Sequence, residues 1–81
     1  MYKTYILKSE KVDRYYIGHA KDLEARMKRH NTCKARSTKA YAPWKVVYCE
    51  EYLTKNEAYR REKQIKSYKK GEAFNKLITE R

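Results

Sequence analysis

The sequence predicts a small α+β domain in which one sheet of three strands is flanked by helices. Strands are expected over residues 2–9 and 44–52, because apolar and aromatic residues alternate with polar ones there. Residues 15–31, YYIGHAKDLEARMKRHN, join a short aromatic strand to a basic helix through a glycine. A capping-box pattern at Thr54 opens a second helix that is expected to run to about Ser67 or Lys70, and residues 72–81 predict a short amphipathic helix that closes the core.

The first two strands are expected to lie side by side. Alternation along residues 2–9 places Tyr5 and Leu7 on one face of the sheet. The polar connection over residues 10–14 is longer than a two-residue hairpin turn, and antiparallel pairing across it would put Tyr5 and Tyr16 on adjacent strands. Cross-strand tyrosines commonly serve packing alone, so both also fit a purely structural role.

Gly18 and the helix after it form the centre of the prediction. Gly18 is expected to make a tight turn, or to allow a close approach that a side chain would block. Asp22 stands where its side chain would cap the helix. Arg26 and His30 fall on the buried face marked by Leu23. Because an unpaired buried charge is costly, Arg26 either pairs with an acid or has a function, and His30 is either a satisfied half-buried histidine or part of a site.

The strand predicted over residues 44–52 follows a polar segment, residues 32–43, which is expected to be mainly an exposed loop that contacts a nucleic-acid backbone. Five alternating residues of this strand are expected to share one face: Trp44, Val46, Tyr48, Glu50 and Tyr52. Glu50 and Glu51 therefore point to opposite faces and cannot form a carboxylate pair on one metal ion.

The second helix carries one acidic residue on its inner face. Ala58, Glu62 and Ile65 recur at helical spacing and mark the side that packs on the sheet. A buried acid at this position has two explanations: it pairs with Arg26, or it holds a metal ion. Gly71 is expected to end the helix.

The formal net charge of +11 indicates a polyanionic partner, most simply nucleic acid. Residues 21–39 hold seven Lys or Arg against two acids, and residues 60–70 hold six against one. Such residues often merely solvate helices, but two clusters flanking one candidate site favour a binding surface. The candidate nucleic-acid contacts are Lys28, Arg29, Lys34, Arg36, Lys39, Lys63, Lys66 and Lys69.

Length and composition limit the class of protein further. The 81 residues are expected to form a single domain, and we expect a cytoplasmic protein because no signal peptide or long apolar run is present. Cys33 and Cys49 are expected to remain thiols. A zinc site that combines them with His19 and His30 is weakly supported, because the chain lacks a C-x-x-C pair.

Five side chains together fit phosphodiester hydrolysis. An oxygen ligand such as Glu62 would hold a hard divalent cation, and a cation such as Arg26 would stabilise charge on the phosphate. Tyr5, Tyr16 and His30 are candidates to orient the attacking water or take its proton, although a tyrosine with its ordinary pKa near 10 is a poor base.

The order and spacing of these residues resemble the GIY-YIG endonuclease superfamily, which includes the N-terminal domain of excinuclease C. Thr4-Tyr5-Ile6 matches the first motif, with Thr in place of Gly, and Tyr16-Ile17-Gly18 matches the second. Arg26 and His30 stand where the family has its arginine and a His or Tyr. Glu62 matches the metal-binding glutamate, and Gln64 replaces the Asn of many members.

This resemblance implies a three-stranded antiparallel sheet flanked by helices and one Mg²⁺ or Mn²⁺ ion on Glu62. Tyr5, aided by His30, would assist the attacking water, Arg26 would stabilise the phosphate, and Tyr16 would position the reacting groups. It implies a DNA endonuclease, with a role in repair or recombination. The alternatives are a weakly active or inactive nucleic-acid-binding module on the same scaffold, and a structural protein that associates with RNA.

Overall fold

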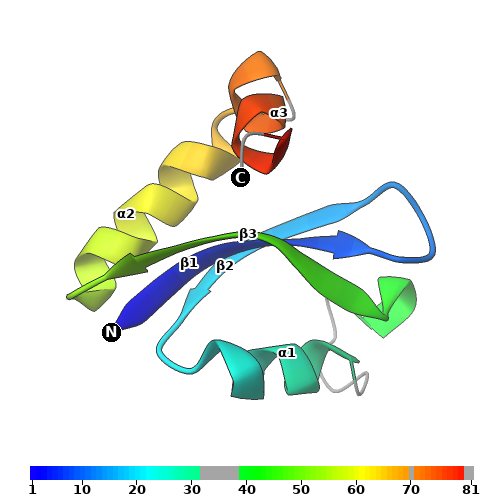
Figure 1. The fold of residues 1–81 in the computed structure, drawn as a ribbon, viewed down its shortest axis with the longest axis horizontal. Coiled ribbons are helices and arrows are strands. Elements are labelled where there is room, and N and C mark those ends of the chain that lie inside the picture. The colour runs from blue at the N-terminus through cyan, green and yellow to red at the C-terminus, as the bar shows by residue number, and fades with distance from the viewer. Residues whose placement is uncertain (32–38, 70, 80–81) are drawn as a thin grey trace.

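The computed structural model describes residues 1–31, 39–69 and 71–79, and these residues form an α+β fold (Figure 1). Its strands are β1 (Tyr2–Ser9), β2 (Tyr15–Ala20) and β3 (Trp44–Tyr52). Its helices are α1 (Leu23–Asn31), the 3-10 turn η1 (Lys39–Tyr41), α2 (Lys55–Lys66) and α3 (Glu72–Thr79). The predicted fold class and the order of its elements are confirmed. No helix in these three ranges has the length and apolar character needed to cross a membrane.

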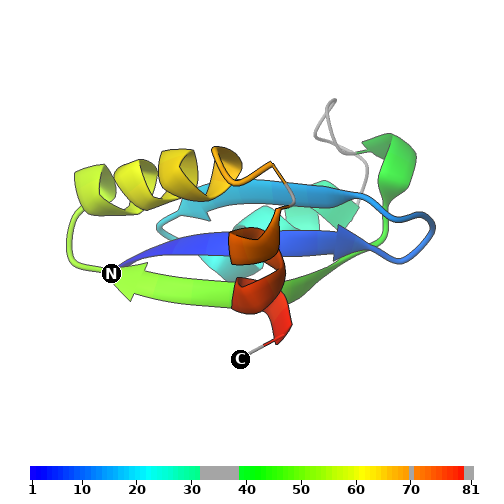
Figure 2. The same ribbon diagram turned by 90° about the horizontal axis from the view of Figure 1, so that it is seen from above.

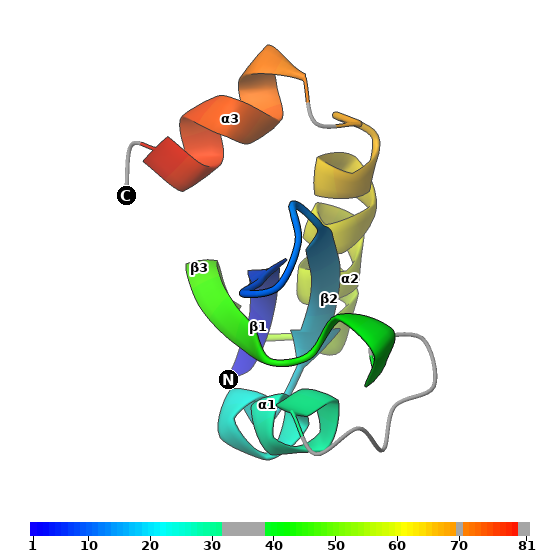
Figure 3. The same ribbon diagram turned by 90° about the vertical axis from the view of Figure 1, so that its right-hand side faces the viewer.

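Strand β1 is the centre of the sheet and pairs antiparallel with both β2 and β3. Helix α1 covers one face, and α2 and α3 cover the other (Figures 1 and 3). Tyr5 and Leu7 of β1 belong to the core beneath α1, whereas Ile6 belongs to the core beneath α2 and α3, as its alternation predicts. Helix α2 lies along the edge strand β2 (Figure 2), so the edge of β2 is where residues from both faces can meet.

Gly18 lies within β2 and does not make the turn that the sequence predicts. The strand continues to Ala20, and Gly18 is the antiparallel partner of Tyr5. The alternative expectation of a close approach is correct: a Cβ atom built on Gly18 would lie 2.8 Å from the Tyr5 hydroxyl oxygen. Glycine at this position therefore makes room for a phenol on the neighbouring strand.

A bulge in β3 divides the residues that are expected from alternation to share one face. Ile6 pairs with Tyr48 and Leu7 pairs with Val46, so the chain holds one extra residue between these pairs. Trp44 and Val46 pack in the core beneath α1, whereas Tyr48 packs with Ile6 on the opposite face. Alternation alone could not predict this switch, because one inserted residue reverses the faces that follow it.

Helix α2 begins at the predicted cap, Thr54, and its C-cap is Ser67, the earlier of the two predicted ends. The side chain of Thr54 accepts a hydrogen bond from the backbone N–H of Glu57, and the Glu57 carboxylate accepts one from Thr54 N–H. The helix ends at Lys66, so Gly71 does not terminate it. Gly71 instead precedes α3, and its carbonyl accepts from Asn75 N–H.

Arg61 and Glu50 tie α2 to β3. The Arg61 guanidinium donates to both Glu50 oxygens, at 2.9 and 3.1 Å, and the hydroxyls of Tyr48 and Tyr52 donate to the same carboxylate. Burial raises the pKa of Glu50, but these hydrogen bonds more than offset it and hold the pKa below the ordinary value of 4.5. The network fixes α2, and with it the inner face of the helix, against the sheet.

Replacing Arg61 with Ala is expected to lower the free energy of unfolding by about 2 kcal/mol, because a half-buried carboxylate loses its charged donor. Arg60→Ala is the matched control, since Arg60 is the exposed neighbour with the same charge. Urea unfolding at neutral pH measures both. The difference in free energy of unfolding between the two variants should shrink as the pH falls below 4.5. The Glu50 carboxylate is then protonated first in the unfolded chain and, at lower pH, in the folded chain. Equal stabilities of the two variants at neutral pH would contradict this assignment.

Candidate active site

Three of the five candidate catalytic side chains form one aromatic cluster between the sheet and α1. The rings of Tyr16 and His30 lie 4.9 Å apart between centroids, and the ring of Tyr5 lies 6.4 Å from Tyr16 and 6.5 Å from His30. Tyr5 is fully buried and His30 is 2% exposed. His30 thus lies on the inner face of α1, as its spacing predicts.

The hydroxyl of Tyr5 is a buried polar group without a hydrogen-bond partner among the described residues. Burial raises its pKa well above the ordinary value of 10, the Tyr16 phenol and the Glu62 charge raise it further, and the Arg26 charge partly opposes this. Tyr5 therefore remains protonated at neutral pH and presents an O–H group, not a phenolate. The charges of Arg26 and Glu62 both act on this one phenol, although neither side chain is hydrogen-bonded to its hydroxyl.

The imidazole of His30 has the opposite tendency. Burial, followed by the positive charges of Arg26 and Arg29, lowers its pKa below the ordinary 6.5. His30 is consequently neutral at physiological pH and retains a nitrogen that can accept a proton. Between Tyr5 and His30, the histidine is the better candidate base.

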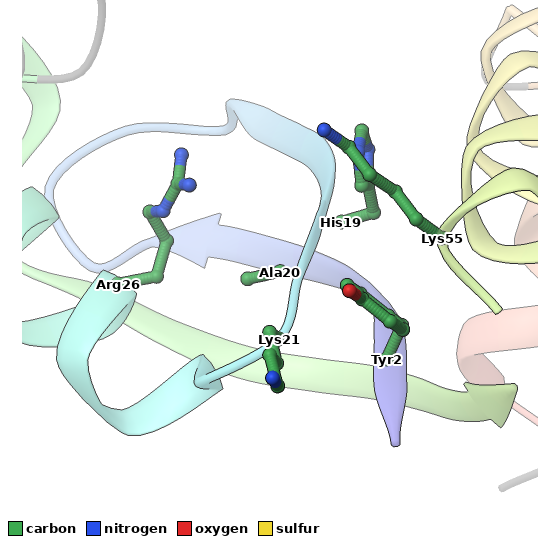
Figure 4. Close-up of a pocket in the computed structure, with 6 residues that line it drawn as sticks. All are labelled: Tyr2, His19, Ala20, Lys21, Arg26 and Lys55. Carbon is green, nitrogen blue, oxygen red and sulfur yellow. The ribbon is translucent and has the colours of Figure 1, made fainter. Parts of the chain in front are cut away.

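Arg26 is exposed, although it lies one helical turn before the buried His30 on α1. It lines a pocket of about 330 Å³ at the C-terminal end of β2, together with Lys21, His19 and Lys55 (Figure 4). The figure shows Arg26 on the α1 side of β2, with His19 and Lys55 on the α2 side. A second pocket beside it, of about 300 Å³, also contains Arg29. The cations make this edge of the sheet an electropositive surface, of the kind that attracts anionic groups.

Glu62 is buried on the inner face of α2, as predicted, but it does not pair with Arg26. Its Oε1 lies 2.6 Å from His19 Nδ1, and its Oε2 lies 2.8 Å from Lys66 Nζ. Burial raises the pKa of Glu62, and the hydrogen bonds from Lys66 and His19 outweigh that effect, so the pKa lies below 4.5. Glu62 is therefore a buried carboxylate that keeps its negative charge at neutral pH.

The donor set fits a magnesium-type ion better than zinc. Mg²⁺ is commonly held by one or two carboxylates, with waters and substrate phosphates completing its shell, and Glu62 supplies one such oxygen next to the cationic pocket. Within the described ranges, His, Cys, Asp and Glu nowhere gather in groups of three or more. His19 and His30 lie on opposite faces of the sheet, and Cys33 is outside the described residues, so the weak zinc hypothesis gains no support.

The basic residues predicted to contact nucleic acid lie on several parts of the surface. Lys28 and Arg29 are exposed on α1, and Lys63, Lys66 and Lys69 are exposed on or after α2. Lys34 and Arg36 lie outside the described residues, and the side chain of Lys39 is not described either.

His19, Lys21 and Lys55 line the pocket that contains Arg26, although no sequence pattern selects them for it. The sequence singles out His19 only as a weak zinc ligand. If β2 is extended through Gly18, alternation places His19 on the same face as Ile17, toward α2 and Glu62. Lys21 follows β2 and Lys55 is the first residue of α2, and no periodicity identifies such positions.

The sequence as a whole also matches a known protein family. Residues 1–76 match the model of the GIY-YIG catalytic domain, so the chain belongs to the GIY-YIG family. Proteins with this domain form a superfamily of nucleases. The predicted resemblance is confirmed. Members of the superfamily act on nucleic acid and generally use a divalent metal ion.

The chain is also similar to small proteins named UPF0213. A relative from Staphylococcus epidermidis is 46% identical over 66 residues, which cover 80% of this chain and 79% of the relative. One from Staphylococcus aureus is 45% identical over 67 residues, covering 82% and 80%. The solution NMR structure of a UPF0213 protein from Bacillus halodurans superimposes with a TM-score of 0.57 and 27% identity, covering 98% of this chain and 88% of that one.

Gly18→Ala is expected to displace the Tyr5 phenol and to lower the free energy of unfolding by about 1–3 kcal/mol, because the new methyl group overlaps the hydroxyl. Thermal unfolding measures the loss. Tyr5→Phe removes the overlapping oxygen, so the double variant should regain part of that stability. Recovery of none of it would show that the hydroxyl is not the group in conflict.

The His30 ring is expected to titrate below pH 6.5, because its imidazolium is disfavoured by burial and by two arginines. NMR of the ring C–H signals measures the pKa directly, and Arg26→Ala should raise it toward 6.5. Since the unfolded chain binds this proton more readily, His30 also makes stability fall as the pH drops below 6.5. A His30 pKa at or above 6.5 would contradict the assignment.

Proposed function

We propose that the chain is a metal-dependent endonuclease that hydrolyses phosphodiester bonds in DNA, acting in repair or recombination in the cytoplasm. The observation that carries the proposal is Glu62, a buried and charged carboxylate at the edge of β2. His19 both holds this carboxylate and lines the cationic pocket that contains Arg26. A metal ligand and a phosphate-binding surface are thereby joined through one residue.

The remaining side chains supply the other parts of a hydrolytic site. Arg26 stabilises negative charge that develops on the phosphate. The protonated hydroxyl of Tyr5 orients the attacking water, and Tyr16 positions the reacting groups. Neutral His30, whose ring is buried beside both phenols, takes the proton. A divalent ion, Mg²⁺ or Mn²⁺, when bound by Glu62, supplies Lewis-acid polarisation of the phosphate.

One observation favours the second candidate, a nucleic-acid-binding module that cleaves weakly or not at all. Both oxygens of Glu62 are already engaged, by His19 and by Lys66. A carboxylate that is satisfied in this way can stabilise the fold without holding a metal ion. The basic surface would then bind nucleic acid, DNA or RNA, with strong salt dependence and little sequence preference.

Glu62→Gln and Arg26→Ala are each expected to reduce Mg²⁺-dependent nicking at least about 100-fold, because one removes the ligand charge and the other a phosphate-stabilising cation. Cleavage is measured on supercoiled plasmid and on a panel of linear, flap and branched DNAs. Fluorescence anisotropy at two salt concentrations, with DNA and RNA of equal length, measures binding separately.

Glu51→Gln and Arg60→Ala serve as controls for the two charge changes, since both residues are exposed. Loss of cleavage with retained binding supports the nuclease. Cleavage that survives both site variants refutes the site assignment, and DNA binding without cleavage in the unchanged protein supports the second candidate.

A further inference from the structure

Lys66 binds one of the two carboxylate oxygens of Glu62, and it can leave that oxygen more easily than His19 can leave the other. Its Nζ lies 2.8 Å from Oε2, and its side chain is 54% exposed, whereas the side chain of Glu62 is 11% exposed. The ammonium is therefore a solvent-reaching group that covers one side of a buried anion. Lys66 lies four residues after Glu62 on α2, so the two side chains are neighbours on one face of the helix.

The other oxygen of Glu62 is held differently. His19 Nδ1 lies 2.6 Å from Oε1, and the side chain of His19 is 21% exposed. The imidazole also packs edge-on against Tyr59, with ring centroids 5.6 Å apart. A ring fixed by its strand and by a neighbouring aromatic has little freedom to leave, whereas a lysine on a four-carbon stem can swing away.

An ammonium and a divalent cation on the same carboxylate oxygen, Oε2, would compete for its negative charge. A magnesium-type ion sits about 2.1 Å from a carboxylate oxygen, and Lys66 Nζ is 2.8 Å from the same atom. Two cations on one oxygen of a carboxylate that is 11% exposed would repel each other. Metal binding through this oxygen thus favours movement of Lys66 away from it, and the Lys66 charge then needs a new counter-anion.

We propose that Lys66 is a built-in competitor of the metal ion on Glu62, and that it moves to a phosphate of the bound nucleic acid when the metal ion binds. The proposal rests on the function proposed above and deepens it. Without nucleic acid, Lys66 keeps Glu62 charged, oriented and closed to metal. With nucleic acid bound, a backbone phosphate replaces Glu62 as the counter-anion of Lys66. Metal ion and nucleic acid then each strengthen the binding of the other, because such coupling is reciprocal.

The first test measures Mn²⁺ binding to the protein without nucleic acid, by the EPR signal of unbound Mn²⁺ at fixed pH and salt. Lys66→Met and Lys66→Gln are expected to bind Mn²⁺ at least about fivefold more tightly than the unchanged protein. Lys63→Met is the control for net charge, since Lys63 lies on the same helix with its ammonium over the Tyr59 ring. Affinities for the Lys66 variants no higher than for Lys63→Met would overturn the proposal.

The second test adds a short DNA oligonucleotide with phosphorothioate linkages. It should tighten Mn²⁺ binding to the unchanged protein more than to Lys66→Met, and equal tightening would overturn the transfer to phosphate.

Glu62→Gln separates this proposal from the proposed function. Unchanged Mn²⁺ binding in Glu62→Gln would refute the metal site and the competitor together. If Mn²⁺ binding is lost in Glu62→Gln but unchanged in the Lys66 variants, only the role of Lys66 as a competitor is refuted.

Discussion

The ion-paired carboxylate of Glu62 is the interaction on which the rest of the site depends. It is a charged group placed between α2 and the sheet, where desolvation would be prohibitive without partners. His19 from β2 and Lys66 from the same helix supply those partners. The Arg61–Glu50 network holds α2 at its other side, against β3. Together these contacts fix one carboxylate at the edge of the sheet, and removal of one partner would leave a buried charge uncompensated.

The edge of β2 is where the two faces of the sheet can act on one substrate. Tyr5, Tyr16 and His30 lie on the α1 side, and His19 and Glu62 lie on the α2 side. Gly18 lets the phenol of Tyr5 lie across β2, and the charge of Glu62 acts on its pKa. The candidate side chains therefore lie on both faces of the edge strand β2, and Arg26 lines the pocket at the end of this strand. They do not line a cavity on a single face of the sheet.

Much of this arrangement could be predicted from the sequence because it follows local periodicity. The three strands, the capping box of α2 and the buried positions of Glu62 and His30 all come from alternation or helical spacing. The wrong predictions concern effects that periodicity does not encode. The bulge in β3 reverses its faces, and Gly18 continues a strand because a phenol from β1 needs its space. The pairing of Glu62 with His19 could not be predicted, because His19 comes from an edge strand 43 residues away.

The most direct test of the proposed metal site on Glu62 is anomalous diffraction from crystals of the protein grown with Mn²⁺ and a short phosphorothioate DNA. We predict one strong peak about 2.1 Å from a carboxylate oxygen of Glu62, with the Lys66 ammonium displaced from Oε2 and His19 still on Oε1. A manganese peak on other residues, with the Glu62–Lys66 pair intact, would contradict this prediction.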